Sequence, residues 1–519
     1  MALSNALALE LAMLLAQDQY LTCNSEHTFF KKRMPRVTNF SIGHLSQVFS
    51  GGSGAPLIGS GSGGPKSGPS NHLDVQRVSD LVGPTYLRSQ VPALNTQALH
   101  GLGPRVSTAA DINIAAAGGV SQPESTVDPD LNSPEEGWAL VDAAAFFMVQ
   151  RAQLNIGGHM VDEIRAEQQY QEWCRTRPDE LRLEEALGIG VAEDRVTRAH
   201  REQVFYTPLM FYYTTAACLY LPVIGLPAHV IQIQFEGCSA ADLWGGVGGT
   251  AHTQPTPAQI ADVEAALRTT KQELMYEGVF LDKMERMQHA TVNQQYVVLE
   301  NQFQESKDIG EGQQEIQLQL NLNHPVATMT VALRPTRFVE PESAFVTLEH
   351  DKIQPVKRGR GGAGEFKTPI QWNDFSNGQA LAGSAERLSP IQHMQLQFNN
   401  YNRLPENQLN SGALFSEVSN EAHGFKGRSH ECFAQTISFC LDGQTTTQYT
   451  GSANLSAADS VTLTIRRNPA PASHYTGGAG VTYLAKYNDP FPKVSLFVHA
   501  KSWNVVNIAS GMFAKSFAN

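Results

Sequence analysis

Apolar and polar residues alternate along several short stretches of the chain. Isoleucine and phenylalanine alternate with glutamine at residues 231–235, and apolar residues alternate with glutamine and asparagine at residues 316–322. The same two-residue period returns at residues 461–465 and 494–498. Because successive side chains of a strand point to opposite faces, this period predicts strands with one buried and one wet face.

Two further apolar runs carry strand signals. Hydrophobic residues lie between turn signals from Val75 to Val91, and the run from Phe146 to Ile156 ends at Gly157 and Gly158, a hairpin signal. Many short strands separated by turn signals are typical of antiparallel β-sandwiches. The pattern therefore predicts an all-β protein.

Helices are few in this pattern. Residues 256–259 (TPAQ) combine a capping box with a proline at the first helical position. They predict a helix whose apolar residues are Ile260, Val263, Leu267 and Leu274. The segments from Glu163 to Cys174 and from Pro178 to Leu187 are two further candidate helices.

The chain divides into an arm and two similar halves. The arm is residues 1–38, and its apolar residues 6–16 predict a short helix that something must cover: the chain's own body, a neighbour or a membrane. A divide near Leu281 and Asp282 gives domains of residues 39–281 and 282–519. Each is long enough for one β-sandwich.

Three segments are expected to be surface loops. They are the Gly/Ser/Pro-rich segment from Gly51 to Ser70, the polar segment from Leu94 to Glu136, and the RGG-like segment from Arg358 to Gly362. Because the strand pattern continues on both sides of each segment, they are expected to be insertions in the sheet framework.

The amino-acid composition makes some classes of function less favourable than others. The 519 residues carry 38 Lys and Arg against 50 Asp and Glu, a net charge of −12. This disfavours a nucleic-acid coat, because binding phosphates needs a basic surface. Only 17% of the residues are charged, below the usual ~25%, and charge is depleted where surfaces are buried against partners. The composition thus favours a protein that assembles.

The cysteines show no zinc or disulfide pattern. They are expected to be buried, reduced thiols, which indicates a reducing compartment. The six are Cys23, Cys174, Cys218, Cys238, Cys432 and Cys440. The apolar start lacks a basic segment and is too short to span a bilayer, so neither a signal peptide nor a transmembrane helix is expected.

The sequence contains three candidate ligand-binding motifs, and each lacks a feature that binding would need. Residues 64–67 (GPKS) resemble a phosphate loop, but Pro65 removes a backbone donor that a phosphate would need. Residues 246–251 fit a dinucleotide motif only loosely and are expected to be a loop. The best local metal cluster is His423, His430, Glu431 and Cys432, expected to be loop residues. The sequence therefore predicts no catalytic, cofactor-binding or metal-binding residue.

Other polar motifs are expected to be structural. The pairs Glu135-Glu136 and Glu184-Glu185 lie in polar stretches and predict solvated faces. The glycosylation sequons at Asn39 and Asn454 are expected to be chance matches or asparagines with a structural role.

Short stretches in order along the chain match the motifs of one protein family. In the first half they are residues 16–22 (AQDQYLT), 28–31 (TFFK), 38–40 (TNF), 79–82 (SDLV), 86–88 (YLR), 156–162 (IGGHMVD), 206–209 (YTPL), 221–224 (LPVI), 280–282 (FLD) and 285–286 (ER). In the second half they are residues 320–325 (LNLNHP), 395–399 (QLQFN) with Arg403, 450–456 (TGSANLS) with Asp459, and Asn504, Ile508 and 510–512 (SGM). Together these stretches resemble the major capsid protein of nucleocytoplasmic large DNA viruses. The chain departs from the family at Thr450, where serine is usual, and at Cys23, where glycine is frequent.

The resemblance implies a fold and an assembly. It implies two tandem eight-stranded antiparallel jelly rolls, a double jelly roll, with a short N-terminal helical arm and long loop insertions. It further implies homotrimeric, pseudo-hexagonal capsomers that tile an icosahedral shell. The expected partners are other copies of the chain, minor capsid or cement proteins and a nearby internal viral membrane, with no direct nucleic-acid contact. The expected place is the virion, after assembly in the cytoplasm of the infected host cell.

Two other functions stay open on the residues alone. A jelly-roll lectin would need a sugar pocket with aromatic residues such as Trp372 or Tyr401. A cupin-like enzyme would need a bound metal. A glycan array tests the first alternative in part, and metal analysis of the pure protein tests the second.

Overall fold

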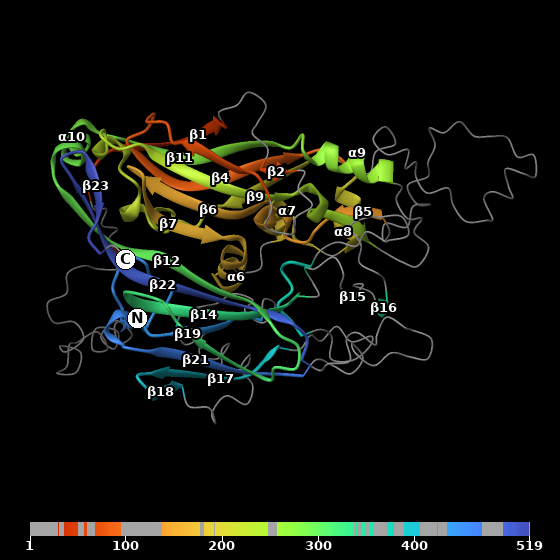
Figure 1. The fold of residues 1–519 in the computed structure, drawn as a ribbon. Coiled ribbons are helices and arrows are strands. Elements are labelled where there is room, and N and C mark those ends of the chain that lie inside the picture. Colours follow the sequence, from red (N-terminus) through yellow and green to blue (C-terminus); the bar gives the residue numbers. More distant parts are fainter. Residues whose placement is uncertain are drawn as a thin grey trace, which may run out of the picture. The chain divides into compact units, whose positions relative to one another are not determined.

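The computed structural model (Figure 1) describes residue 30 and residues 36–49, 57–59, 68–94, 137–176, 181–190, 192–247, 257–336, 339, 345–347, 353–355, 371–377, 389–404, 423, 433–469 and 491–517. Contacts divide the chain into Met1–Phe40 and Ser41–Asn519, and the sheets belong to the second unit. The predicted arm helix and residues 358–362 lie outside the described residues, as do most of residues 51–70 and 94–136.

The first half of the chain forms two sheets. One has the strand order β1-β11-β4-β8, and the other has the order β2-β9-β6-β7, with β3 also paired to β9. Their bounds are β1 Phe40–Val48, β2 Ile58–Gly59, β3 Ser70–Asp74, β4 Leu81–Val91, β6 Val149–Ile156, β7 His159–Arg165, β8 Gln203–Pro208, β9 Ile231–Ser239 and β11 Lys271–Leu281. Strands β6 and β7 form the predicted hairpin, and Gly157 and Gly158 take the positive φ angles, 61° and 83°, of a tight turn.

The second half repeats this arrangement. Its sheets have the orders β12-β22-β14-β19 and β13-β21-β17-β18. The bounds are β12 Gln294–Ile309, β13 Glu315–Gln319, β14 Pro325–Pro335, β17 Ile391–Phe398, β18 Tyr401–Leu404, β19 Gln435–Ser438, β21 Val461–Arg467 and β22 Val494–Ala509. The strands bounded above can be numbered one to eight in chain order within each half, with β2 and β3 sharing number two. In both halves one sheet then has the strand order 1-8-3-6 and the other has the order 2-7-4-5. This is jelly-roll order, so the predicted double jelly roll is confirmed.

The remaining described elements are short. The extra strands are β5 Gly137–Leu140, β10 Trp244–Val247, β15 Phe345–Thr347, β16 Ile353–Pro355, β20 Ala453–Asn454 and β23 Met512–Lys515. The helices are α5 Ala144–Met148, α6 Ala166–Thr176, α7 Leu181–Leu187, α8 Ala192–Arg198, α9 Pro257–Leu267 and α10 Lys283–Thr291, with 3-10 turns η1 Tyr212–Thr214, η2 Ala217–Leu219, η3 Val223–Gly225, η4 Ala240–Asp242 and η7 Leu455–Ala457.

Alternation along the strands builds a core inside each jelly roll. In β9, Ile231, Ile233 and Phe235 are buried between partly exposed glutamines, and β21 buries alternate residues in the same way. Leu318 was expected in the core but is only partly buried, because β13 is the edge strand of its sheet. At residues 494–498 of β22 the predicted wet face is wrong, because Phe497 is buried together with Leu496 and Val498.

Strand β22 completes the larger sheet of the second jelly roll. It is 16 residues long and lies between β12 and β14. It pairs with β12 from Ile508 to Val494, and with β14 from Ser502 to Val494. The last long strand of the chain is thus a central strand.

Several predicted boundaries are wrong. The helix expected from Glu163 begins at Ala166, because β7 keeps pairing with β6 up to Arg165. The apolar run from Phe146 starts as α5 and becomes a strand only at Val149.

Three other boundaries differ for similar reasons. The strand expected from Val75 begins at Leu81, and helix α9 ends at Leu267, so Leu274 lies in β11. Gly246 and Val247, expected in a loop, pair with β5 as part of β10. In each case the boundary of the strand or helix is set by pairing between strands. The local pattern of apolar and polar residues carries no information about that pairing.

Candidate functional site at the junction of the two jelly rolls

Helix α6 lies where the two jelly rolls meet. Its residues Tyr170, Trp173 and Cys174 belong to a core cluster that also contains Trp372 and Phe497 from the second half of the chain. Its polar residues are buried as well; they are Glu167, Gln168, Gln169, Gln171 and Arg175. Buried polar groups need hydrogen-bond partners, so α6 depends on side chains from other elements.

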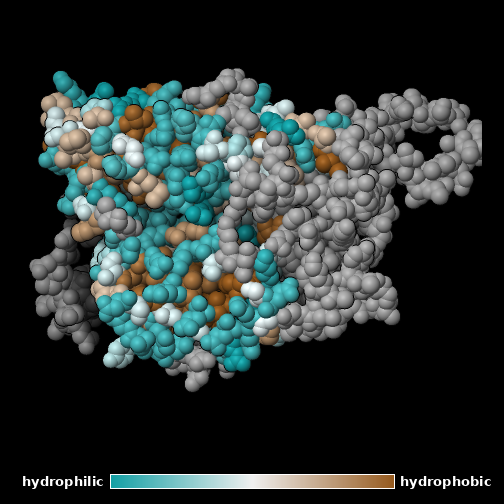
Figure 2. Space-filling model, in the orientation of Figure 1, coloured by the Kyte–Doolittle hydropathy of each residue, from teal (hydrophilic) through white to brown (hydrophobic). Residues whose placement is uncertain are grey.

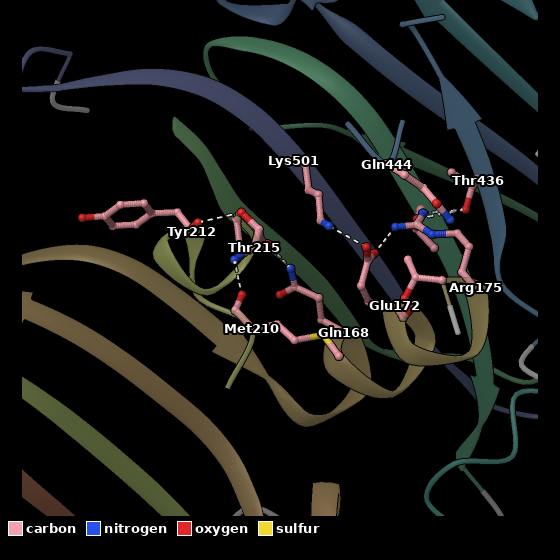
Figure 3. A network of polar contacts seen from close by, with 12 residues as sticks. Gln168, Glu172, Arg175, Met210, Tyr212, Thr215, Thr436, Gln444 and Lys501 are labelled. Atoms are coloured by element: carbon pink, nitrogen blue, oxygen red, sulfur yellow. Dashed lines mark hydrogen bonds and ion pairs between the residues drawn. The ribbon is translucent and has the colours of Figure 1, made fainter. Parts of the chain in front are cut away.

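An ion cluster ties α6 to the second jelly roll (Figure 3). Glu172 pairs with Arg175 one turn along the helix and with Lys501 of β22, whose Nζ lies 2.5 Å from Glu172 Oε1. Arg175 also donates to the hydroxyl oxygens of Thr330 in β14 and Thr436 in β19, at 2.6 and 2.9 Å. Burial would raise the pKa of Glu172, but Arg175 and Lys501 lower it to about 2. The Glu172 carboxyl is therefore ionised at neutral pH.

Trp372 forms a second link between the two halves. It is fully buried, it stacks on Phe147 with ring centres 5.1 Å apart, and its Nε1 donates to the backbone oxygen of Asp142 at 2.9 Å. Its own backbone oxygen accepts a hydrogen bond from Arg334 Nη1 at 2.7 Å. Trp372 is thus a core residue, and the prediction that it could line a sugar pocket is wrong.

Asp162 of β7 is a buried carboxylate between the jelly rolls. Its Oδ2 accepts from the backbone N of Tyr212 at 2.9 Å, and its Oδ1 accepts from the backbone N of Asn301 in β12 at 3.1 Å. Burial raises the pKa of Asp162 to about 7, although these hydrogen bonds lower it, and the charge of Glu300 raises it further. Asp162 therefore titrates near neutrality, unlike Glu172.

A pocket of about 450 Å³ opens beside these groups. Both jelly rolls line it: Thr85 and Tyr86 of β4, Gln168 and Glu172 of α6, Asn301 of β12 and Lys501 of β22. Since Glu172 and Lys501 are paired with each other, the arrangement is suited to holding the two halves together. In the part of the chain that the structure describes, no group of three or more His, Cys, Asp or Glu could hold a metal ion.

The structure describes only some of the candidates named from the sequence. His423 is described as a turn residue, whereas His430, Glu431 and Cys432 lie outside the described residues, as do residues 64–67 and 248–251. Glu184 and Glu185 belong to α7, and Tyr401 is an exposed residue of β18. Glu135 and Glu136 lie outside the described ranges.

Asparagines and cysteines divide between structural and surface positions. The side chain of Asn454 accepts from the backbone N of Ser456 at 3.1 Å and caps η7, which is a structural role; Asn39 is exposed just before β1. None of the described cysteines is part of a disulfide. Cys174, Cys238 and Cys440 are buried as expected, but Cys218 is exposed, so the expectation is wrong there.

Sequence reasoning missed most of the junction residues. Glu172, Arg175, Asn301 and Lys501 belong to no motif named above, and only Asp162 ends one, at residues 156–162. One local feature could have indicated a buried polar site: the sequence of α6 combines glutamine, glutamate and arginine with the aromatic residues Tyr170 and Trp173. Among the described helices, none is long and apolar enough to cross a membrane.

Comparison with known proteins identifies the family. Residues 28–282 match the model for the N-terminus of major capsid proteins, and residues 285–514 match the model for the large eukaryotic DNA virus major capsid protein. The chain is 23% identical over 515 residues to the major capsid protein of Paramecium bursaria Chlorella virus 1, covering 97% of each chain.

Solved structures show the same fold. The PBCV-1 virus capsid, as a quasi-atomic model, matches with a TM-score of 0.63 at 19% identity, covering 95% of this chain and 100% of that one. The Faustovirus major capsid protein matches with a TM-score of 0.60 at 11% identity, covering 97% and 96%. The two family models together span nearly the whole chain, and their members are structural proteins. The chain therefore belongs to the family of large eukaryotic DNA virus major capsid proteins: it is a shell protein of the virion and not an enzyme.

Proposed function

We propose that three copies of this chain form a pseudo-hexagonal capsomer and that such capsomers tile the icosahedral shell of a large double-stranded DNA virus. The observation that supports this most directly is the repeated strand order, which gives each chain two like units. Three chains around a threefold axis then present six similar units. Such a ring uses one heterologous interface and closes on itself, so it does not extend into a fibre.

The mass in solution tests the trimer. Light scattering on a gel-filtration column should give three times the 56.6 kDa of the chain, about 170 kDa. Negative-stain images of the same fraction should show a hexagonal outline. The protein should be produced together with the partner proteins that assist its folding. If it then runs as a single species with the mass of one chain, the proposal is contradicted.

The proposal extends to the parts of the chain and its partners. Residues 1–38 act as an arm that ties neighbouring capsomers or faces the internal membrane, and residues 39–281 and 282–519 are the two jelly rolls. The family models support this division, because one ends at residue 282 and the other begins at residue 285. The described cysteines form no disulfide, which fits assembly in the host cytoplasm, a reducing compartment.

An exposed apolar surface marks a docking site for minor capsid proteins. Helix α10 has no buried residue, and Met284 and Met287 on it are both more than half exposed. The 3-10 turn η3 contacts α10, and β23, which begins with exposed Met512, lies at the same end as α10 in Figure 1. Figure 2 shows moderately apolar residues mixed with hydrophilic ones at this end. Flexible methionine side chains adapt to apolar partners, which supports the assignment.

Charge on this surface should block docking without harming the fold. The double substitution Met284→Lys with Met287→Lys is expected to leave the mass in solution unchanged, because neither side chain is buried. Incorporation into particles should fall at least about tenfold, since each methionine buried against a partner contributes about 1.5–3 kcal/mol. The measurement is the fraction of the chain recovered in purified virions. The matched control is Tyr401→Lys, at an exposed position of β18; an equal loss for this control would refute the docking site.

A further inference from the structure

A second, much smaller cavity lies between helix α6 and the larger sheet of the second jelly roll. Gln171 and Arg175 of α6, Thr328 and Thr330 of β14 and His499 of β22 are among the residues that line it. Its volume is about 10 Å³, which is close to the room that one water molecule needs. The cavity therefore has the size of a water site and is too small for an organic ligand.

Two buried side chains of this cavity have no hydrogen-bond partner in the part of the chain that the structure describes. Gln171 is 3% exposed and His499 is 4% exposed. Neither Oε1 nor Nε2 of Gln171 is hydrogen-bonded, and the same holds for Nδ1 and Nε2 of His499. A buried polar atom without a partner lowers stability, and native proteins contain few such atoms. Four of them at one cavity indicate that their partner occupies the cavity itself.

The two sides of the cavity are held in place by their elements. His499 lies between Thr330 of β14 and Phe303 of β12 in the sheet, and its ring centre is 5.0 Å from that of Phe303. On the other side, Gln171 is next to Glu172, which pairs with Lys501 of β22. Strand pairing and this ion pair therefore fix the distance between α6 and β22, so the cavity does not close around the unbonded atoms.

The unbonded atoms include both donors and acceptors. Burial lowers the pKa of His499 to about 3, so its ring is neutral at neutral pH and has one N–H donor and one acceptor nitrogen. The Gln171 amide likewise has a donor group and an acceptor oxygen. An anion would leave the acceptors without a partner, and a cation would leave the donors without one. A water molecule can both donate and accept, so it suits this set of atoms.

We propose that one buried water molecule occupies this cavity and bridges Gln171 of α6 to His499 of β22. The water accepts from an N–H of one side chain and donates to the acceptor atom of the other. It adds a polar link between a helix of the first half and the central strand of the second jelly roll. The larger pocket of about 450 Å³ shares the lining residues Gln168, Glu172 and Lys501 with this cavity, so it provides a route by which the water enters.

A map of the full-length protein at a resolution that shows ordered water tests the proposal directly. It should show one peak in the cavity within about 2.7–3.2 Å of an atom of Gln171 and of an atom of His499. The proposal is overturned if the map shows an empty cavity, or if Gln171 and His499 are bonded to each other there.

Stability measurements give a second test. Gln171→Met and His499→Phe replace each polar side chain by an apolar one of similar shape, and each takes a partner from the water. Each should lower the midpoint of thermal unfolding by roughly 1–3 °C. The double variant should lose less than the sum of the two, because either substitution already breaks the bridge. A higher midpoint for Gln171→Met would show that its amide had no partner to lose, and strictly additive losses would show that nothing connects the two side chains.

The matched control is Gln435→Met in β19. Gln435 is also buried, at 1% exposed, and both polar atoms of its amide also lack a hydrogen bond, but it lines neither of the two cavities. This substitution removes two unbonded atoms without taking a partner from the water, so the midpoint should stay the same or rise. An equal loss in Gln435→Met would assign the effect of Gln171→Met to the buried amide itself and would contradict the bridge.

Discussion

Replacing Glu172 by glutamine is expected to lower the free energy of unfolding by about 3–5 kcal/mol, because it removes the carboxylate from a buried ion cluster. Arg175 is buried and loses the Glu172 carboxylate, while its hydrogen bonds to the hydroxyls of Thr330 and Thr436 remain. Lys501 loses the partner at 2.5 Å. Urea denaturation at neutral pH measures the loss.

The matched control is an ion pair of the same kind at the surface. Glu185 pairs with Arg201 at 2.9 Å, but both side chains are more than half exposed, so Glu185→Gln should cost about 1 kcal/mol or less. The folded-state pKa of Glu172 is depressed, so its contribution is present above the unfolded value of about 4.5 and is lost as pH falls toward about 2. The gap between wild type and Glu172→Gln should shrink over that range. Equal effects of the two substitutions at neutral pH would contradict the account.

Truncation of Trp372 to alanine is expected to cost about 3–5 kcal/mol, the range for a large aromatic residue removed from a core. The substitution removes the stacking on Phe147 and the hydrogen bond to Asp142. Both partners lie in the first half of the chain, so the loss should weaken the union of the jelly rolls as well as the local core. Thermal unfolding should show a lower midpoint.

A graded series checks this interpretation. Trp372→Phe keeps an aromatic ring against Phe147 but loses the indole donor, so it should cost less than the alanine variant, about 1–2 kcal/mol. Tyr401→Ala, at an exposed ring, should change stability by no more than about 0.5 kcal/mol. A Trp372→Ala protein as stable as Tyr401→Ala would show that Trp372 does not join the halves.

The strands could be predicted because their cause is local. In β9 and β21 the two-residue period is set by which side chains face the core, and that information lies in adjacent residues. The pairing order of the strands has no such local source; the family resemblance implied it. Boundaries failed where pairing set them, as at Arg165, the last residue of β7.

The junction could not be predicted for a related reason. Glu172 and Lys501 are 329 residues apart, and Asp162 and Asn301 are 139 apart, so neither contact leaves a pattern in either segment alone. The sequence left Trp372 open as an aromatic residue of a sugar pocket, whereas in the structure it is buried against Phe147 and Tyr170 of the other half. The composition of a segment does not indicate that residues far away in the sequence will bury it.

The central place of β22 has a consequence for synthesis of the protein on the ribosome. Strands β12 and β14 emerge long before residues 494–509, yet each pairs with β22. Until those last residues leave the exit tunnel, the facing edges of β12 and β14 carry unpaired backbone groups that can join another chain. The first jelly roll has its own eighth strand, β11, by residue 281 and can fold while translation continues. These two strand edges of the second half therefore stay unpaired for the time needed to translate the residues between β14 and β22.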